Sequence, residues 1–297
     1  RAHVLREPDH KPRLEQALDR RVEDPLAIRG VLAATVKELD LTGAACCAVL
    51  SPELYSLRQV DPPAVEAREL REAARWSIKD LVDFSVEDAI VDAFPSPEVR
   101  GRPARLNVVA ARRRTLQHHL EILERSGLAL VAIDILELTL RNLAELLPSE
   151  ARGVGILHTL PPLGVLTLSS GGSLWFSRQL ETDAEALEAA AEEALSEKLE
   201  PGGGAEPALQ ALLLDLQRSF DYYEHQLGQV APAELYLTPS RVGSENLRVW
   251  LAKNSSVAVR ELDLDALLDS PVRLDRELAG AVVAPLGAAL RRQARAP

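Results

Sequence analysis

The stretch that decides the fold is residues 153–178, with the sequence GVGILHTLPPLGVLTLSSGGSLWFSR. It holds three apolar runs, and each run has the length of a β-strand. Pro161-Pro162 separates the first two runs and Gly171-Gly172 separates the last two, and both pairs are typical of turns. The runs cover residues 153–158, 164–168 and 173–178. The stretch therefore predicts a three-stranded meander.

Strand and helix patterns alternate on both sides of this meander. After it we expect helices over 184–199 and 207–227, strand 234–237, helix 244–253, strand 257–262 and a final helix over about 275–292. Before it, after an irregular start, we expect helix 25–39, strands 44–50 and 55–60, helix 64–81, strands 89–94 and 106–110, helix 115–126, strand 128–133 and helix 136–147. This alternation predicts an α/β protein in two halves, with a boundary near 148–153.

The composition is that of an ordinary globular chain. The 297 residues carry 45 acidic and 34 basic side chains, a formal net charge of −11, and 46% of them are hydrophobic. An acidic balance argues against a dedicated nucleic-acid binder, because neutralising phosphates requires a basic surface. The one tight basic cluster, Arg112 to Arg114, is interpreted as a solvated helix end. There is no run of eighteen apolar residues and no secretory leader, so we expect a cytoplasmic protein without a membrane span.

Motifs for catalysis and metal binding are missing from the sequence. It contains no Gly-x-Ser-x-Gly elbow, no His-Glu-x-x-His helix and no Gly-x-Gly-x-x-Gly turn. Gly202 to Gly204 follow no strand and precede no Lys-Ser or Lys-Thr, so a phosphate-binding loop is excluded there. Two cysteines and six scattered histidines offer no metal-ligand spacing. We therefore expect no catalytic residue and no metal site.

Six short motifs are more specific. They are Arg75 to Leu81, Glu87 to Ala89, Leu106 to Ala111, Ile133 to Leu138, Leu140 to Leu143 and Arg218 to Glu224. With these motifs the chain resembles the MshI proteins of the mannose-sensitive haemagglutinin (MSHA) pilus, which are similar to the PilM proteins of type IV pili. The resemblance extends from about Pro25 to Arg292.

The resemblance implies a two-lobed actin-like ATPase fold of the ribonuclease H-like class. Residues 1–150 would form the first lobe, which is subdomain 1A with a 1C-type insertion over about 55–111. Residues 151–297 would form the second lobe, with subdomains 2A and 2B. The last helix would return to subdomain 1A.

The resemblance also implies a function in assembly. A PilM-like protein lies at the cytoplasmic face of the inner membrane, where it docks the short N-terminal tail of a PilN-like membrane protein, here of MshJ type, and meets other pilus assembly proteins. The first hypothesis is therefore a cytoplasmic scaffold held at the inner membrane through its partners. The alternatives are an ATP-binding switch of the same machine and the cytoplasmic domain of a GspL-like type II secretion protein.

The family holds ATP and magnesium in two hairpins that contain glycine and aspartate, and this sequence departs from that pattern. Arg1 to Leu5 resemble the family's second strand, which leaves the first hairpin outside the sequence. The second hairpin, expected within 157–164, lacks Asp-x-Gly, and both 179–183 and 238–243 lack a Gly-Gly pair, so side chains would crowd a nucleotide. The residues expected to border the cleft are His158, Thr159, Ser240 and Gly243. We expect a degenerate cleft with no cofactor, and bound ATP with magnesium is the alternative.

The first half offers a surface for the partner. A peptide that docks as an added strand needs an unpaired edge or an apolar groove, and strands 55–60, 89–94 and 106–110 offer edges. Aromatic side chains are enriched where peptides dock. The side chains expected to line the groove are Trp76, Phe84 and Phe94. The alternative is that these strands only complete the sheet of the insertion, with Trp76 and Phe94 in its core.

Overall fold

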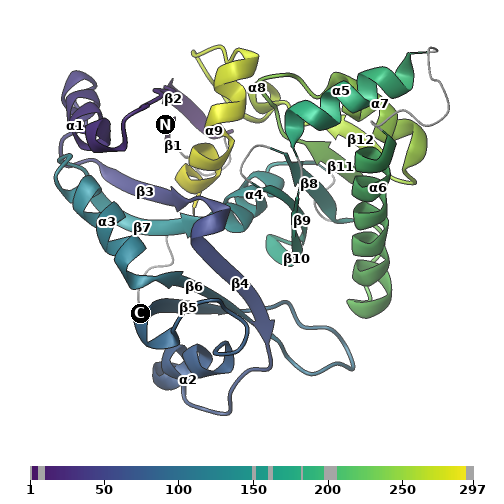
Figure 1. Ribbon diagram of the computed structural model, residues 1–297, viewed down its shortest axis with the longest axis horizontal. Coiled ribbons are helices and arrows are strands. Elements are labelled where there is room, and N and C mark those ends of the chain that lie inside the picture. Colours follow the sequence, from purple (N-terminus) through teal and green to yellow (C-terminus); the bar gives the residue numbers. More distant parts are fainter. Residues whose placement is uncertain are drawn as a thin grey trace. The chain divides into compact units, whose positions relative to one another are not determined.

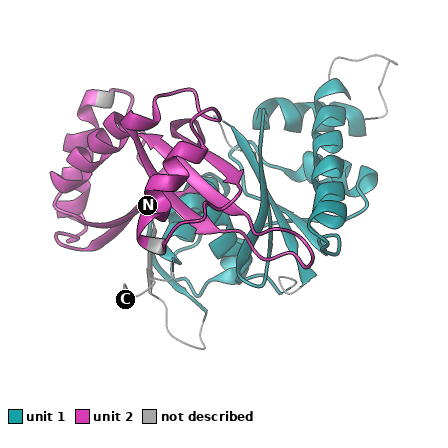
Figure 2. Cartoon of the chain, turned by 90° about the horizontal axis from the view of Figure 1, so that it is seen from below, with its two compact units in different colours: residues 1–19, 136–297 teal, residues 20–135 magenta. Residues whose placement is uncertain are grey.

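The computed structural model describes residues 2–5, 11–148, 152–159, 163–181, 183–196 and 206–291. These residues form two compact units (Figure 2). The larger unit contains residues 1–19 and 136–297, and the smaller unit contains residues 20–135. Each unit has its own sheets and its own hydrophobic core.

A five-stranded sheet runs through the larger unit in the order β10-β9-β8-β11-β12. The strands are β8 (Val154–His158), β9 (Gly164–Ser170), β10 (Ser173–Leu180), β11 (Glu234–Leu237) and β12 (Ala258–Glu261). The first three pair antiparallel, which confirms the predicted meander, and β11 runs parallel to both β8 and β12. Gly171 and Gly172 form the β9–β10 turn with φ of +57° and +69°, a conformation that glycine adopts at little cost.

Helices cover both faces of this sheet (Figure 1). One face carries α5 (Ala184–Leu195), α6 (Glu206–Asp221) and α7 (Glu245–Asn254), and the other carries α4 (Leu136–Ala144) and α9 (Arg276–Ala289). Along β9, Leu166 and Leu168 point into the first core and Val165 points into the second. A strand that is buried on both faces is apolar throughout, which explains the continuous run in the sequence.

Helices α4 and α9 cross in direct backbone contact. A Cβ atom at Gly287 of α9 would overlap the backbone carbonyl group of Thr139 in α4. At the same crossing, Asn142 Nδ2 donates to the carbonyl oxygen of Gly287 at 2.8 Å. All of these groups are buried, so the bond satisfies polar atoms that water does not reach.

An N-terminal hairpin, which the sequence patterns did not predict, completes the larger unit. Strand β1 (Ala2–Leu5) pairs antiparallel with β2 (Arg13–Ala17). The chain after the short helix α8 (Leu264–Leu267) holds β2, because Leu14 N donates to Asp269 O at 2.9 Å and Asp269 N donates to Pro12 O at 2.9 Å. The Leu14 side chain is fully buried in the core formed by α4 and α9.

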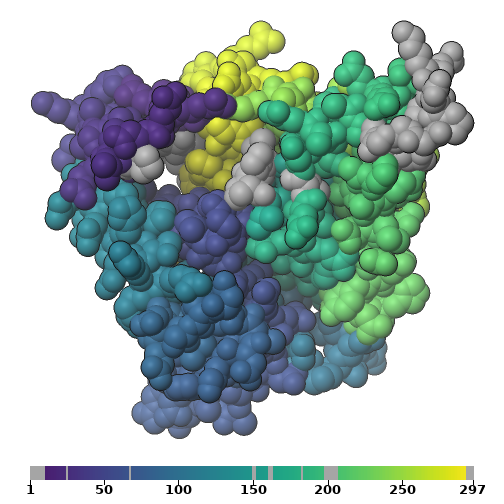
Figure 3. All heavy atoms as spheres, viewed as in Figure 1, coloured from purple at the N-terminus to yellow at the C-terminus, as the bar shows by residue number. Residues whose placement is uncertain are grey.

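The smaller unit contains an antiparallel sheet in the order β4-β6-β5. Its elements are β4 (Tyr55–Val60), β5 (Ala89–Pro95), β6 (Leu106–Arg112) and the helix α2 (Leu70–Ser77). Helix α2 packs Ala74 against one face of the sheet, in a core with Val91, Val108 and Ala110. This segment forms the blue surface in Figure 3.

A parallel pair of strands and two helices make up the rest of the smaller unit. They are β3 (Ala45–Leu50), β7 (Ala129–Ile135), α1 (Ile28–Glu38) and α3 (Arg113–Glu124). Gly127, with φ of +85°, ends the turn between α3 and β7, as expected for a helix C-terminus.

The helix expected over 64–81 is shorter in the structure. A 3₁₀ turn over Ala67–Glu69 leads into α2, which ends at Ser77. Beyond it the chain continues in turns, with Leu81 N donating to Ile78 O at 2.9 Å. The helical spacing of the apolar residues extended the prediction too far. Ile78 is buried, as that spacing requires, but it is buried by the turn that follows α2 and not by a continuation of the helix.

The division into lobes near 148–153, with an insertion over 55–111, stays a prediction. Helix α4, which the prediction gives to the first lobe, belongs to the same compact unit as the five-stranded sheet. Helix α9, the last in the chain, packs against α4 and β1.

The crossing of α4 and α9 predicts opposite effects for two glycine-to-alanine changes. Gly287→Ala should lower the free energy of unfolding by about 1–3 kcal/mol or more, because the new methyl group has no room. Gly30→Ala should raise it by about 0.5–1 kcal/mol, because Gly30 lies in α1 with nothing within 4 Å of its Cβ position. Urea unfolding of the three proteins measures both values, and equal stabilities would contradict the close crossing.

Candidate functional site

The expected cleft residues gather where β8 and β11 end. These strands are parallel neighbours, so His158 and Thr238, which end or follow them, lie side by side at the carboxyl edge of the sheet. His158 Nδ1 and Thr238 Oγ1 are 3.0 Å apart, within hydrogen-bonding distance. Thr159 and Ser240 are also buried. In open α/β sheets this edge is where ligands bind, and here the two side chains bind each other.

The imidazole of His158 is uncharged at neutral pH. Its side chain is buried, and burial lowers its pKa from 6.5 to about 4, because the charged form would lose its hydration. A neutral ring offers no positive charge to a phosphate group. The arrangement is therefore suited to joining the two strand ends rather than to binding an anion.

The loop from β11 to α7, residues 238–243, is packed onto its own unit. Ser240 Oγ donates to the carbonyl oxygen of Gly243 at 2.5 Å. A Cβ atom at Gly280 of α9 would lie only 3.1 Å from Pro239 O, so this helix and the loop backbone are in close contact. No glycine pair opens this loop, in agreement with the sequence pattern.

Arg241 fastens the same loop by two ion pairs. Its Nη2 atom lies 2.9 Å from Asp19 Oδ2, just after β2, and 2.7 Å from Glu277 Oε1, in the first turn of α9. The three side chains are partly exposed, so each pair adds little to the stability of the fold. Together they connect the loop to two elements that are distant in the sequence.

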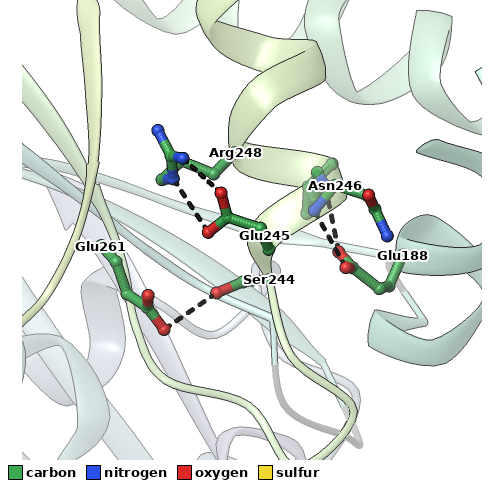
Figure 4. Close-up of polar contacts among 7 residues, drawn as sticks. Glu188, Ser244, Glu245, Asn246, Arg248 and Glu261 are labelled. Carbon is green, nitrogen blue, oxygen red and sulfur yellow. Dashed lines mark hydrogen bonds and ion pairs between the residues drawn. The ribbon is translucent and has the colours of Figure 1, made fainter. Parts of the chain in front are cut away.

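The first turn of α7 follows this loop and is surrounded by acidic side chains (Figure 4). Glu188, from α5, accepts hydrogen bonds from Asn246 N and Leu247 N, each at 3.0 Å. Ser244 Oγ donates to Glu261 Oε1 at 3.4 Å. A hydrogen bond from Arg248 lowers the pKa of Glu245. The two N–H groups that could hold a phosphate are thus already bonded to a carboxylate.

Sequence patterns gave no sign of Glu188. Thr238 and Arg241 belong to the loop 238–243, whose side chains were expected to crowd a nucleotide, but their partners were not predicted. Glu188 and Arg241 have partners between 36 and 222 positions away, counting from the residue numbers, and only the folded chain brings these residues together.

The three aromatic residues expected to line a docking groove lie on different surfaces. Trp76 is 51% exposed on α2, which excludes it from the core of the insertion. Phe84 packs against the core beneath α2, with the Arg112 guanidinium 4.7 Å from its ring centre. Ala93 joins the same core, so its neighbour Phe94 points to the opposite face of the sheet. The structure therefore does not bring the three side chains together.

Two of the three strands expected to offer edges do so. β6 lies in the middle of the sheet and offers none, which corrects the expectation for residues 106–110. The β5 edge is obstructed: Asp92 Oδ1 accepts from Ala93 N at 3.0 Å, Arg113 Nη2 donates to Ala89 O at 3.4 Å, and Pro95 has no N–H.

The β4 edge is obstructed less, at the carbonyl group of Leu57. Arg58 Nη1 donates to the carbonyl oxygen of Leu57 at 3.3 Å, so the backbone of Leu57 points away from β6. Because the two directions alternate along an antiparallel strand, the N–H and C=O of Gln59 point outward too. This edge carries the half-buried side chain of Leu57 on the face opposite α2.

Comparisons with known proteins identify the architecture. No protein-family model matches the sequence, and no curated protein matches it. A chain of the PilM-PilN type IV pilus biogenesis complex matches with a TM-score of 0.71 at 23% identity, over 97% of this chain and 92% of that chain. The fold is actin-like.

Two further matches are weaker. The cytoplasmic domain of EpsL, an inner-membrane component of the Vibrio cholerae type II secretion system, gives a TM-score of 0.40 at 16% identity, over 71% of this chain and 67% of that chain. A Bacteroides thetaiotaomicron protein with an actin-like ATPase fold gives 0.45 at 12% identity, over 84% and 81%.

Two features are absent from the described part of the chain. No group of three or more His, Cys, Asp or Glu side chains in that part could hold a metal ion. No helix among the same residues is long and apolar enough to cross a membrane.

The burial of His158 predicts a specific loss of stability in acid. The unfolded chain takes up this proton near pH 6.5 and the folded chain only near pH 4, so stability is complete above pH 6.5 and falls as the pH drops towards 4. The loss amounts to about 3 kcal/mol for the 2.5-unit difference.

Replacing the His158 side chain tests whether it causes the loss of stability in acid. His158→Asn should flatten the pH dependence of the free energy of unfolding between pH 6.5 and 4, even if it lowers the stability at pH 7. His118→Asn is the control, because His118 is exposed on α3. Equal slopes for the wild-type chain and His158→Asn in urea titrations would contradict the prediction.

Proposed function

We propose that the chain is an assembly component of a type IV pilus machine of MSHA type, which docks the cytoplasmic tail of a PilN-like inner-membrane protein. The main support is the match to the PilM-PilN complex, which covers nearly the whole of both chains. The MshI-like motifs, Arg75 to Leu81 and Arg218 to Glu224 among them, support the MSHA type. On this proposal the protein stays at the cytoplasmic face of the inner membrane through its partner.

We also propose that the nucleotide cleft is degenerate and that the protein acts as a scaffold rather than as an ATPase. Three features support this. The strand ends that would face phosphates carry a neutral His158 bonded to Thr238. Loop 238–243 is packed against α9, and the first-turn N–H groups of α7 are bonded to Glu188.

A melting experiment tests the degenerate cleft. Millimolar Mg-ATP should change the melting temperature of the chain by less than about 1 °C. A site at 100 times its dissociation constant would instead add about 2.7 kcal/mol, a shift of several degrees. A clear rise with Mg-ATP, absent with magnesium alone, would favour the ATP-binding switch.

The β4 edge is the proposed place for the partner's tail. An extended peptide can bond to the outward N–H of Leu57 and to the outward N–H and C=O of Gln59, and it can place side chains beside Leu57; the carbonyl oxygen of Leu57 already accepts from Arg58 Nη1. At the opposite edge, β5, the N–H of Ala93 and the carbonyl oxygen of Ala89 are bonded to side chains and Pro95 has no N–H. The exposed Trp76 and the half-buried Phe94 stay candidates for additional contacts on the two faces of this sheet.

A matched pair of lysine substitutions tests this edge. Leu57→Lys should weaken binding of a synthetic peptide of the PilN-like tail by about tenfold or more, because a charge would lie beside the added strand. Ile90→Lys places the same charge on the same face of the sheet at the β5 edge and should bind as the wild type does. Fluorescence anisotropy measures both affinities.

Different binding results would contradict different parts of the proposal. Equal weakening by both substitutions would contradict the choice of edge. If the tail binds and only Trp76→Ala or Phe94→Ala weakens it, the site lies on one of the faces. If the wild-type chain does not bind the tail, the proposed partner is wrong.

A further inference from the structure

Glu188 joins two helices through an uncommon contact. Its two carboxylate oxygens accept from consecutive backbone N–H groups, those of Asn246 and Leu247, each at 3.0 Å (Figure 4). The acceptor lies early in α5 and the donors lie in the first turn of α7. A carboxylate at this end of a ten-residue helix is favoured by the helix dipole, and hydrogen bonds to a charged acceptor are among the strong ones.

The residues next to the helix do not replace this contact. Ser244 is the N-cap residue of α7, but its side chain makes no capping bond and instead meets Glu261. Glu245, at the first helical position, is bonded to Arg248. The two N–H groups therefore depend on a side chain from another helix.

Side chains lie close to the backbone of Gly243, just before α7. Its φ is +93°, and a Cβ atom there would lie 2.9 Å from Arg276 Nη1 and 3.9 Å from Glu188 Oε1. Side chains from α5 and from α9 thus border the same point of the backbone, immediately before α7. The three helices meet at the end of loop 238–243.

We propose that Glu188 is a tethered ligand, a device by which α5 holds the first turn of α7 and the attached loop 238–243 closed without any bound molecule. In this position the chain's own carboxylate occupies the donors that would otherwise be open to an anion. The proposal concerns the conformation of the larger unit alone and does not depend on the pilus assignment or on the partner.

Hydrogen exchange of the full chain tests the device. Glu188→Ala should speed the exchange of the Asn246 and Leu247 amides by about tenfold or more, because both acceptors are lost, while the amides of β8 and β9 keep their rates. Glu192→Ala removes the same charge from an exposed position of α5 and should change neither amide. Glu188→Gln, which keeps the shape and one acceptor, should give a smaller increase and serves if the alanine variant does not fold.

Three results decide the question. Wild-type exchange at both amides in Glu188→Ala and Glu188→Gln would overturn the proposal. A tenfold slowing of the same amides in the wild-type chain on addition of Mg-ATP would also overturn it, because closure would then require a ligand. Mg-ATP that raises the melting temperature and leaves both amides unchanged would contradict the degenerate cleft and support closure without a ligand.

Discussion

The backbone contact between Gly287 and Thr139 is the constraint on which the larger unit depends. One face of the five-stranded sheet is covered by α4 and α9, and the two helices lie close enough only because position 287 has no side chain. The bond from Asn142 to Gly287 O fixes the crossing along the helix axes as well. The N-terminal hairpin follows from the same packing, since the buried Leu14 of β2 belongs to this core.

Internal hydrogen bonding is the second constraint on the larger unit, and it acts at the carboxyl edge of the five-stranded sheet. Three sets of buried polar groups there are paired within the chain: His158 with Thr238, Ser240 with Gly243, and the α7 amides with Glu188. A buried polar group without a partner costs about 1–3 kcal/mol. Internal pairing removes that cost in the unliganded chain.

The sequence predicted the elements well where burial is two-sided or turns are marked by glycine. Residues 153–178 are an example, because every apolar run was a strand and Gly171-Gly172 was the turn. The end of α2 was predicted less well, since Ile78 is buried by a turn and helical spacing does not distinguish the two. The order of the strands in a sheet could not be predicted from the sequence pattern, so β6 could not be recognised as the central strand.

The residues expected to border a cleft stay a prediction, and the contacts that they make were not predicted. His158, Ser240 and Gly243 lie at the strand ends and in the loop, but the contacts from His158 to Thr238 and from Glu188 to the amides of Asn246 and Leu247 join segments that are distant in the sequence. Such contacts leave no periodicity and no motif, because a hydrogen bond across the fold requires only one suitable atom at each end.

An actin-like fold with a closed interior can still act through its edges. Docking a peptide as an added strand requires unpaired backbone groups and a nearby apolar side chain, and it requires no metal, no glycine-rich hairpin and no catalytic group. On the proposal above, the β4 edge would supply such groups from Gln59 and the N–H of Leu57, within a unit that has its own core. The side chains that close the larger unit lie in α5, α7, α9 and the ends of β8 and β11, so internal pairing there leaves the β4 edge unchanged. On the scaffold proposal, loss of nucleotide chemistry and retention of the fold are therefore compatible.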